Sequence, residues 1–347
     1  MIADLIEEAE RRIKELKADW DTMLVIARQN EERELRKNIP PNTYVNGLHG
    51  EGQTSNHVRF RILRHLGTGS YGDVSEMQEV STGNVYARKL ICYHDESEAK
   101  RVENEVKNEV KVMQRLRHHH IASVLLWIRD MESKTFSIFM LPVADFDLAF
   151  YLDERCAGSG FDRSQVKLME PWFGCLVTAL AFAHGLRIKH EDIKPSNILI
   201  KDGSPYLADF GSAKDFSGLD RSITTDESNK GTPKYLAPEE RPGEPKGRAT
   251  DIFALGCVFC EMLAVRQGIS REEFHEIRQE SNYGLPFRDT LQNVYQWLEE
   301  LDDLNEAGEV IRDVTRSMLN PIKEERPDAR KLRRQFRGEE TLICAQC

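Results

Sequence analysis

Two short segments of this chain concentrate side chains that suit phosphoryl transfer. Asp192, Lys194 and Asn197 lie in one loop-like stretch, and Asp209 follows in an Asp-Phe-Gly turn. Transfer of a phosphoryl group needs an acceptor for the proton of the attacking hydroxyl, a cation beside the phosphate and oxygen ligands for Mg²⁺. A carboxylate, an ammonium group and an amide in one loop, with a second carboxylate on a nearby turn, provide those groups.

A glycine-rich segment lies upstream of that loop. Gly67, Gly69 and Gly72 follow the pattern Gly-x-Gly-x-x-Gly, which on its own also occurs in dinucleotide-binding folds. The flanking apolar residues indicate a strand, a glycine turn and a second strand, whereas a dinucleotide fingerprint requires a helix after the third glycine. Because glycine lacks a Cβ, such a hairpin lets backbone N–H groups approach phosphates closely.

Further segments complete an ordered set. They are Val85-Tyr86-Ala87-Arg88-Lys89-Leu90, Ala237-Pro238-Glu239, Asp251-Ile252-Phe253-Ala254-Leu255-Gly256 and Glu325-Arg326-Pro327. With the glycine segment and the two phosphoryl-transfer segments, they resemble the protein kinase family over roughly residues 56–336. Residues 140–145 and 231–235 look most similar to kinases of filamentous fungi.

The resemblance implies an α+β class and the bilobal protein-kinase fold. A small β-rich lobe with one main helix precedes a larger, mainly helical lobe, and an N-terminal helix precedes both. The expected boundaries are an amphipathic helix over 1–40, a linker over 41–56, a kinase domain over 57–338 with lobes 57–140 and 144–338, and a tail over 339–347. The Asp of the segment beginning at Asp251 is expected to hold the catalytic loop, and Arg326 is expected to pair with Glu239.

The same resemblance assigns roles to the catalytic loop and implies ATP and Mg²⁺ as cofactors. Asp192 would accept or orient the proton of the substrate hydroxyl, and Lys194 would neutralise charge on the γ-phosphate. Asn197 and Asp209 would hold Mg²⁺.

Nucleotide binding would involve the small lobe. Lys89 would bind the α- and β-phosphates and be oriented by a Glu from a helix over about residues 96–116. Family spacing relative to His118 favours Glu109 as that partner, with Glu105 as the alternative. The other expected nucleotide-binding residues are Gly67, Gly69, Gly72, Val74, Ala87, Met140, Leu141, Val143 and Leu199.

Lys194 and Thr232 bear on the substrate class. An Asp-x-Lys-Pro-x-Asn loop and a Thr five residues before Ala237 resemble serine/threonine kinases. Asp145, Asp147 and Glu261 could favour a basic residue near the phosphorylation site; such acidic residues are also frequent without that role.

Glu191 stands where most regulated kinases carry an Arg that pairs with an activation-loop phosphate. A carboxylate there would repel phosphate, so we expect catalysis without phosphorylation of Thr224, Thr225 or Ser228. Loop order would then come from contacts such as Glu191 with Lys214 or Lys230.

Residues 1–37 carry an apolar stripe in steps of three and four, the pattern of a coiled coil or an amphipathic helix. Two interpretations have equal weight. The stripe mediates self-association or binds a partner helix, or it docks on the small lobe of the same chain.

The composition excludes other classes. A net charge of −10 argues against nucleic acid or an anionic membrane as the main partner. No signal peptide or membrane-spanning run is evident, so we expect a cytoplasmic or nuclear protein.

Seven scattered cysteines indicate no disulfide framework. Cys344 and Cys347 form one C-x-x-C pair without two further zinc ligands in sequence, which favours a loose tail. Three adjacent histidines, His118, His119 and His120, face different ways and are not expected to bind one ion.

Two functions of other classes compete with an ATP-dependent serine/threonine kinase acting on protein substrates. A pseudokinase scaffold would have lost Lys89, Asp192, Asn197, Asp209 or the glycines, and all are present. An interaction protein would act mainly through residues 1–37.

Overall fold

The chain divides into two compact units, Met1–Asn46 and Gly47–Cys347. This computed structural model describes residues 45–46, 60–69, 72–155, 163–212, 214–215, 232–240, 247–278, 285–301 and 304–347. In the first unit only the short strand β1 (Val45–Asn46) is described. The predicted helix over 1–40 therefore lies outside the described residues.

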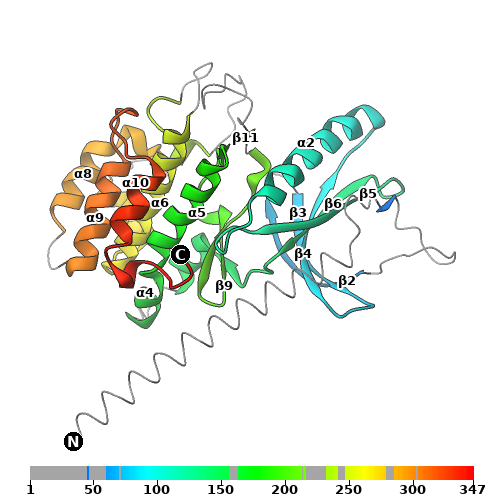
Figure 1. Cartoon of the computed structure of the whole chain (residues 1–347), viewed down its shortest axis with the longest axis horizontal. Helices are drawn as coiled ribbons and strands as arrows, with labels where there is room; N and C mark the ends of the chain where they lie inside the picture. Colours follow the sequence, from blue (N-terminus) through cyan, green and yellow to red (C-terminus); the bar gives the residue numbers. More distant parts are fainter. Residues whose placement is uncertain are drawn as a thin grey trace, which may run out of the picture. The chain divides into compact units, whose positions relative to one another are not determined.

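A twisted β-sheet forms the first part of the second unit (Figure 1). Its neighbouring strands follow the order β5, β6, β4, β3, β2, and all pair antiparallel. They span Phe60–Gly69 (β2), Gly72–Glu79 (β3), Val85–Cys92 (β4), Ser123–Asp130 (β5) and Thr135–Leu141 (β6). Gly69 pairs with Gly72 across β2 and β3, so the glycine segment is the strand–turn–strand hairpin that the sequence predicts.

Helix α2 (Glu96–Arg115) is the main helix beside this sheet (Figure 1). It begins at Asp95, whose carboxylate accepts hydrogen bonds from the backbone N–H groups of Ser97 and Glu98, a standard N-terminal cap. Val102, Val106 and Val110 are buried at a spacing of four residues, which places them on one helix face. Glu109 is also buried, so the packing of this face determines where its carboxylate lies.

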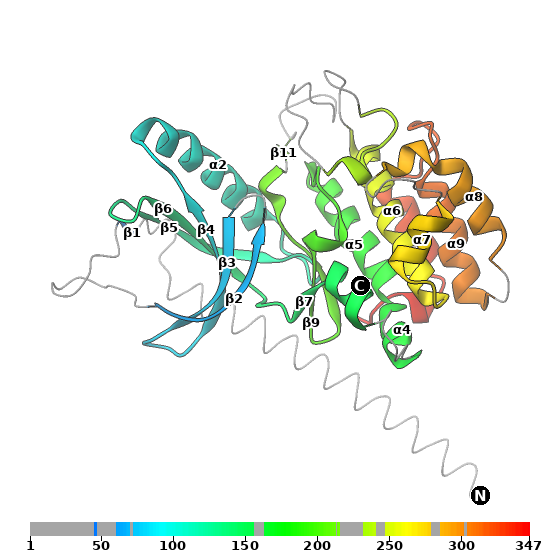
Figure 2. The ribbon, with the colours of Figure 1, turned by 180° about the vertical axis from the view of Figure 1, so that it is seen from behind.

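The second part of the unit is mainly helical (Figure 2). Its helices are α3 (Leu148–Phe150), η1 (Tyr151–Arg155), α4 (Arg163–Met169), α5 (Trp172–Gly185), α6 (Arg248–Arg266), α7 (Arg271–Ile277), η5 (Phe287–Asp289), α8 (Leu291–Glu299), α9 (Glu306–Met318) and α10 (Ala329–Phe336). Nearly every residue of α5 and α6 is buried, because a helix that is apolar all round packs within a core.

The helical stretch Val166–Gly185 is long and apolar enough in composition to cross a membrane, which the sequence analysis did not anticipate. However, 67% of its most apolar window is buried inside the fold. Packing within the helical lobe therefore accounts for its apolar composition.

Short strands flank the loop that contains the predicted catalytic residues. β7 (Phe146–Asp147), β9 (Ile198–Lys201) and β10 (Ser204–Leu207) form one sheet, and β8 (Ile188–Lys189) pairs with β11 (Lys214–Asp215). The 3₁₀ turns η2 (Pro195–Asn197), η3 (Phe210–Ser212) and η4 (Pro233–Tyr235) follow in the same region. The loop from β8 to β9 is thus fixed at both ends. The whole unit has the two-lobed α+β architecture predicted from the sequence.

The C-terminal segment is not the loose tail that the sequence predicts for 339–347. The turn η6 (Glu340–Leu342) places Leu342 in the core with no exposed surface. A Cβ on Gly174 of α5 would lie 2.3 Å from the carbonyl oxygen of Leu342, so only glycine permits this close packing. Arg333 and Arg337 donate hydrogen bonds to the carbonyl oxygen of Cys347. The prediction is wrong because the segment carries its own core residue.

Candidate active site

Asp251 of α6 holds the catalytic loop in place. Its carboxylate accepts hydrogen bonds from the backbone N–H groups of His190 and Glu191, each at 2.9 Å. The side chain of His184 lies 2.8 Å from the same carboxylate. Burial favours the neutral acid, but these partners outweigh it and hold the pKa of Asp251 below its usual value. The buried carboxylate therefore stays charged and fixes the loop, as the sequence predicts.

Asp192 is the centre of a network within that loop. Lys194 Nζ lies 2.9 Å from its Oδ2, and the amide nitrogen of Asn197 donates to Oδ2 at 3.1 Å. The hydroxyl and backbone N–H of Thr232 both lie 3.0 Å from Oδ1. The Thr232 hydroxyl also accepts a hydrogen bond from Lys194 at 2.9 Å. A carboxylate with this many donors is held in one orientation, as a proton acceptor at a reaction centre must be.

Lys89 joins the two lobes through a pair of carboxylates. Its Nζ lies 3.0 Å from Oε1 of Glu109 and 2.9 Å from Oδ1 of Asp209. The contact with Glu109 is the one that the sequence predicts. The alternative, Glu105, instead forms an exposed ion pair with Arg101 on the same helix.

The charges in this triad determine its protonation. Burial would lower the pKa of Lys89, but the carboxylates of Glu109 and Asp209 raise it above its ordinary value. Burial raises the pKa of Glu109 in spite of Lys89. For Asp209, Lys89 outweighs burial, and the pKa falls below its usual value. Lys89 is therefore a cation and Asp209 an anion at neutral pH, as phosphate and metal binding require.

Asp209 and Asn197 are the residues that would hold Mg²⁺. Asp209 adopts a left-handed backbone with φ of 59°, an uncommon conformation for a residue other than glycine and one often found at functional sites. The N–H of Ala208 donates to the carbonyl oxygen of Asn197 at 2.9 Å, which links the two ligands through the backbone. Because the amide nitrogen of Asn197 faces Asp192, its amide oxygen faces away. One carboxylate and one amide oxygen fit the hard-ligand preference of Mg²⁺.

The residues expected around adenine come from four strands and from the segment after β6. Ala87 pairs with Met140 across β4 and β6, and Val74 of β3 pairs with Lys89. Leu199 lies on β9 and is only partly buried. Leu141 ends β6, and Val143 follows it with partial exposure. Apart from the buried Ala87, these apolar side chains keep some exposed surface, which suits an apolar ring site.

His190, Phe210 and Met113 connect the catalytic loop to α2. The rings of His190 and Phe210 lie 4.4 Å apart, and His190 Nε2 is 2.9 Å from the carbonyl oxygen of Ala208. Met113 and Phe210 are each only 1% exposed. The turn η3, which begins at Phe210, contacts α2, the helix that carries Glu109.

Glu191 has a buried partner that the sequence analysis did not suggest. Lys189 Nζ lies 2.9 Å from its Oε1, and both side chains are buried. Lys214 pairs with Lys189 through the backbone of β11 and β8. The side chain of Lys214 lies outside the described residues, as do Lys230, Thr224, Thr225 and Ser228. The contacts of Glu191 with Lys214 or Lys230 therefore stay predictions.

The acidic residues considered for a basic substrate already bind groups of the chain itself. Glu261 is fully buried between Lys234 and Arg271. Asp145 contacts Lys201 at 2.7 Å, and Asp147 caps the N–H of Phe150. The hypothesis is wrong for Glu261, whose carboxylate is buried. The sequence also gave no sign that Lys234 and Arg271 both bind Glu261, because the three residues share no motif.

Glu239 and Arg326 form the expected long-range pair. Two parallel contacts of 2.6 Å and 2.7 Å join the guanidinium to the carboxylate. The Arg326 side chain has no exposed surface. This pair fixes the segment after Thr232 to the helical lobe.

Comparisons with known proteins agree with this geometry. Residues 60–336 match the family model described as "Protein kinase domain". The chain is similar to Mitogen-activated protein kinase kinase kinase A of Dictyostelium discoideum, with 30% identity over 218 residues that cover 62% of this chain and 22% of the relative. It is similar to Serine/threonine-protein kinase fused of Drosophila melanogaster, with 33% identity over 210 residues covering 59% and 24% of the two chains.

A third relative is cAMP-dependent protein kinase catalytic subunit 3 of Drosophila melanogaster, with 32% identity over 218 residues covering 61% of this chain and 35% of the relative. The match thus spans about a quarter to a third of the length of these curated relatives.

Proposed function

Since this chain belongs to the protein kinase family, we propose that it transfers the γ-phosphate of Mg-ATP to serine or threonine hydroxyls of protein substrates. The observation that carries this proposal is the network around Asp192. It brings a buried carboxylate, the Lys194 ammonium and the Thr232 hydroxyl within 3.0 Å of one another. Two of the three relatives carry serine/threonine kinase or protein kinase catalytic subunit in their names.

Each residue has a defined task in this proposal. Asp192 orients the substrate hydroxyl and accepts its proton as the hydroxyl oxygen attacks phosphorus. Lys194 offsets the negative charge on the transferred group. Lys89 binds phosphate oxygens of the nucleotide while Glu109 holds the ammonium in place. Preorganised charges of this kind contribute several kcal/mol to lowering a barrier.

A bound Mg²⁺ would supply neutralisation of the negative charge on the phosphates. Asp209 and the amide oxygen of Asn197 are the ligands that this chain offers. Asp209 also contacts Lys89. In the proposed cycle the Lys89 ammonium exchanges part of that contact for phosphate oxygens.

A pseudokinase scaffold is the alternative function. The structure keeps Lys89 paired with Glu109 and keeps Asp192, Asn197 and Asp209 in one site. A binding scaffold has no need for a positioned proton acceptor. These features favour turnover.

We also infer that activity does not require an activation-loop phosphate. Glu191 occupies the position of the phosphate-binding Arg of regulated kinases, and its charge is already balanced by buried Lys189. A phosphate brought to that position would meet a carboxylate. Activity in the cytoplasm or nucleus, association through residues 1–37 and the narrower likeness to fungal kinases remain predictions from the sequence.

Turnover tests the proposal directly. The purified full chain is incubated with Mg²⁺, labelled ATP and a mixed protein substrate, and phosphorylated residues are identified by mass spectrometry. We expect phosphoserine and phosphothreonine. Asp209→Asn should lower the rate by at least about a hundredfold, because it removes a charged metal ligand.

Asp202→Asn is the matched control, since Asp202 lies on an exposed turn and should leave the rate unchanged. Equal labelling by wild type and Asp209→Asn, or labelling of tyrosine alone, would contradict the proposal.

A further inference from the structure

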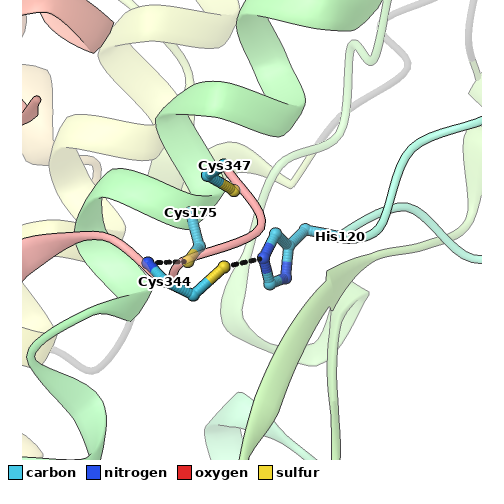
Figure 3. A group of neighbouring side chains, drawn as sticks. All are labelled: His120, Cys175, Cys344 and Cys347. Atoms are coloured by element: carbon cyan, nitrogen blue, oxygen red, sulfur yellow. Dashed lines mark hydrogen bonds between the residues drawn. The ribbon is translucent and has the colours of Figure 1, made fainter. Parts of the chain in front are cut away.

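Four potential metal ligands that are not part of the candidate active site lie close together. His120, Cys175, Cys344 and Cys347 offer one nitrogen and three sulfur atoms, all within 4.8 Å of one another. Figure 3 shows the four side chains turned toward each other. They come from the connection between α2 and β5, from helix α5 and from the C-terminal segment.

The chemistry and the spacing of these ligands suit zinc. A tetrahedral site with Zn–S of about 2.3 Å and Zn–N of about 2.0 Å separates its ligand atoms by about 3.5–3.8 Å. His120 Nε2 lies 3.2 Å from Cys344 Sγ, and all four ligand atoms lie within 4.8 Å of one another, so shifts of about 1 Å or less would bring the set to this size. Three sulfurs and an imidazole favour Zn²⁺ over Mg²⁺ or Ca²⁺. The Cys344-x-x-Cys347 spacing is typical of structural zinc sites.

His120 is oriented as a metal ligand is. Its Nδ1 lies 2.8 Å from the carbonyl oxygen of Pro205, so Nδ1 carries the proton and donates it. Nε2 then presents its lone pair to the cysteines. An N–H donated from the second ring nitrogen to a carbonyl is the usual support of a metal-bound histidine.

The sulfur atoms have comparable support. The backbone N–H of Cys344 points to Cys175 Sγ at 3.4 Å, the kind of outer contact that supports metal ligands. Cys175 has no exposed surface, and His120 is 3% exposed. The N–H of Cys347 donates to the carbonyl oxygen of Cys344 at 3.1 Å, which closes a turn between the two C-terminal cysteines. Cys344 and Cys347 keep partial exposure. Four protein ligands leave no open position, as in structural rather than catalytic zinc sites.

The fold brings these ligands together through contacts that do not depend on them. Gly174 lets Leu342 pack directly on α5 beside Cys175. The backbone of His120 is tied to β10, where the N–H of Leu207 donates to its carbonyl oxygen at 2.8 Å. These contacts therefore position the ligands without help from a metal.

We propose that His120, Cys175, Cys344 and Cys347 bind one structural Zn²⁺ ion that fastens the C-terminal segment to α5 and to the α2–β5 connection. The ion links three segments that are distant in sequence. One of them directly follows α2, the helix that carries Glu109. Of the three adjacent histidines only His120 takes part, which agrees with the different directions of neighbouring side chains.

Metal analysis of the full chain tests this proposal. Protein purified under reducing conditions in the presence of zinc is analysed by elemental mass spectrometry after gel filtration. We expect about one zinc per chain, and its loss in Cys344→Ser and in His120→Ala. The matched controls are Cys92→Ser, on an exposed strand position, and His119→Ala, in the same turn, and both should retain the zinc.

Measurements on the wild-type chain alone guard against variants that fail to fold. Replacement of zinc by Co²⁺ should give the visible absorption of tetrahedral cobalt with thiolate charge-transfer bands. A zinc chelator should lower the melting temperature, and added zinc should restore it. A chain that takes up no zinc, zinc retained by Cys344→Ser, or a disulfide among these cysteines in reduced protein would each overturn the proposal.

Discussion

Two buried ion pairs use similar residues for different purposes. Lys89 and Glu109 meet between a strand and a helix of the small lobe, and Lys89 has a second partner, Asp209, whose side chain is 30% exposed. Arg326 and Glu239 form a two-pronged pair with no exposed guanidinium surface. Arg326 also donates to the carbonyl oxygens of Asn320 and Ala249. Lys89 thus has a partly exposed partner, Asp209, that could give way to a ligand. The donors of Arg326 bind oxygens of the chain itself.

The first pair should therefore matter mainly for activity and the second mainly for stability. A charged group whose partners include a solvent-facing carboxylate can release part of its contacts to a substrate. A group whose donors all bind buried oxygens contributes to folding and would leave those oxygens unpaired if removed. The comparison can be tested by removing each cation in turn.

Lys89→Met should have the largest effect on activity. Methionine keeps the length of the side chain but loses the charge that binds phosphate, so the transfer rate should fall at least about a hundredfold. The melting temperature should change less than in the Arg326 variant, because the remaining Asp209 carboxylate is 30% exposed and Glu109, whose pKa is raised by burial, can take up a proton. Lys107→Met removes a Lys–Glu pair on the surface of α2 and should retain activity.

Arg326→Met should have the largest effect on stability. Removal of one partner of a buried pair costs about 3–5 kcal/mol in the free energy of unfolding, which chemical denaturation measures. The matched variant Arg312→Met removes an exposed pair with Asp313 and should cost less than about 0.5 kcal/mol. Similar losses in the two variants would show that the Arg326 pair does not fix the fold.

Glu109→Ala and Glu105→Ala compare two positions one helical turn apart. Glu109→Ala should lower the transfer rate, because Lys89 loses the carboxylate that positions it. Glu105→Ala removes an exposed contact with Arg101 and should cost about 0.3–0.5 kcal/mol in stability, without a change in rate. A greater loss of activity in Glu105→Ala would show that Glu105, and not Glu109, is the functional partner of Lys89.

Removal of activation-loop phosphate should have the smallest effect. Enzyme treated with phosphatase, and the triple variant Thr224→Ala, Thr225→Ala, Ser228→Ala, should retain most of the wild-type rate. The reason is that Glu191 and Lys189 already neutralise each other. A large loss that is restored by rephosphorylation at one of these residues would show that a different basic group binds the phosphate.

Much of the candidate site could be predicted because its residues are close in sequence or lie at fixed spacings. Asp192, Lys194 and Asn197 share one loop, and Glu109 follows from the spacing that kinases keep between the pairing Glu and a His at the position of His118. The partner of Asp251 was also predictable from the family pattern.

The contacts that escaped prediction join residues without a shared pattern. Cys175 lies in an apolar helix, where a cysteine resembles any small core residue. Its approach to Cys344 depends on Gly174 and Leu342, which only the fold brings together. The fold of residues 1–44 and the activation-loop hydroxyls lie outside the described residues, so those predictions are untested.

The central claim is that Asp192 acts on the reaction rather than on the fold or on nucleotide binding. The most direct test measures, on one preparation of Asp192→Asn, the rate of phosphoryl transfer, the affinity for Mg-ATP and the melting temperature. The account predicts a rate lower by at least about a hundredfold, with binding and melting close to those of wild type. A rate equal to that of wild type would contradict it, because transfer would then proceed without the carboxylate that the Lys194, Asn197 and Thr232 side chains surround.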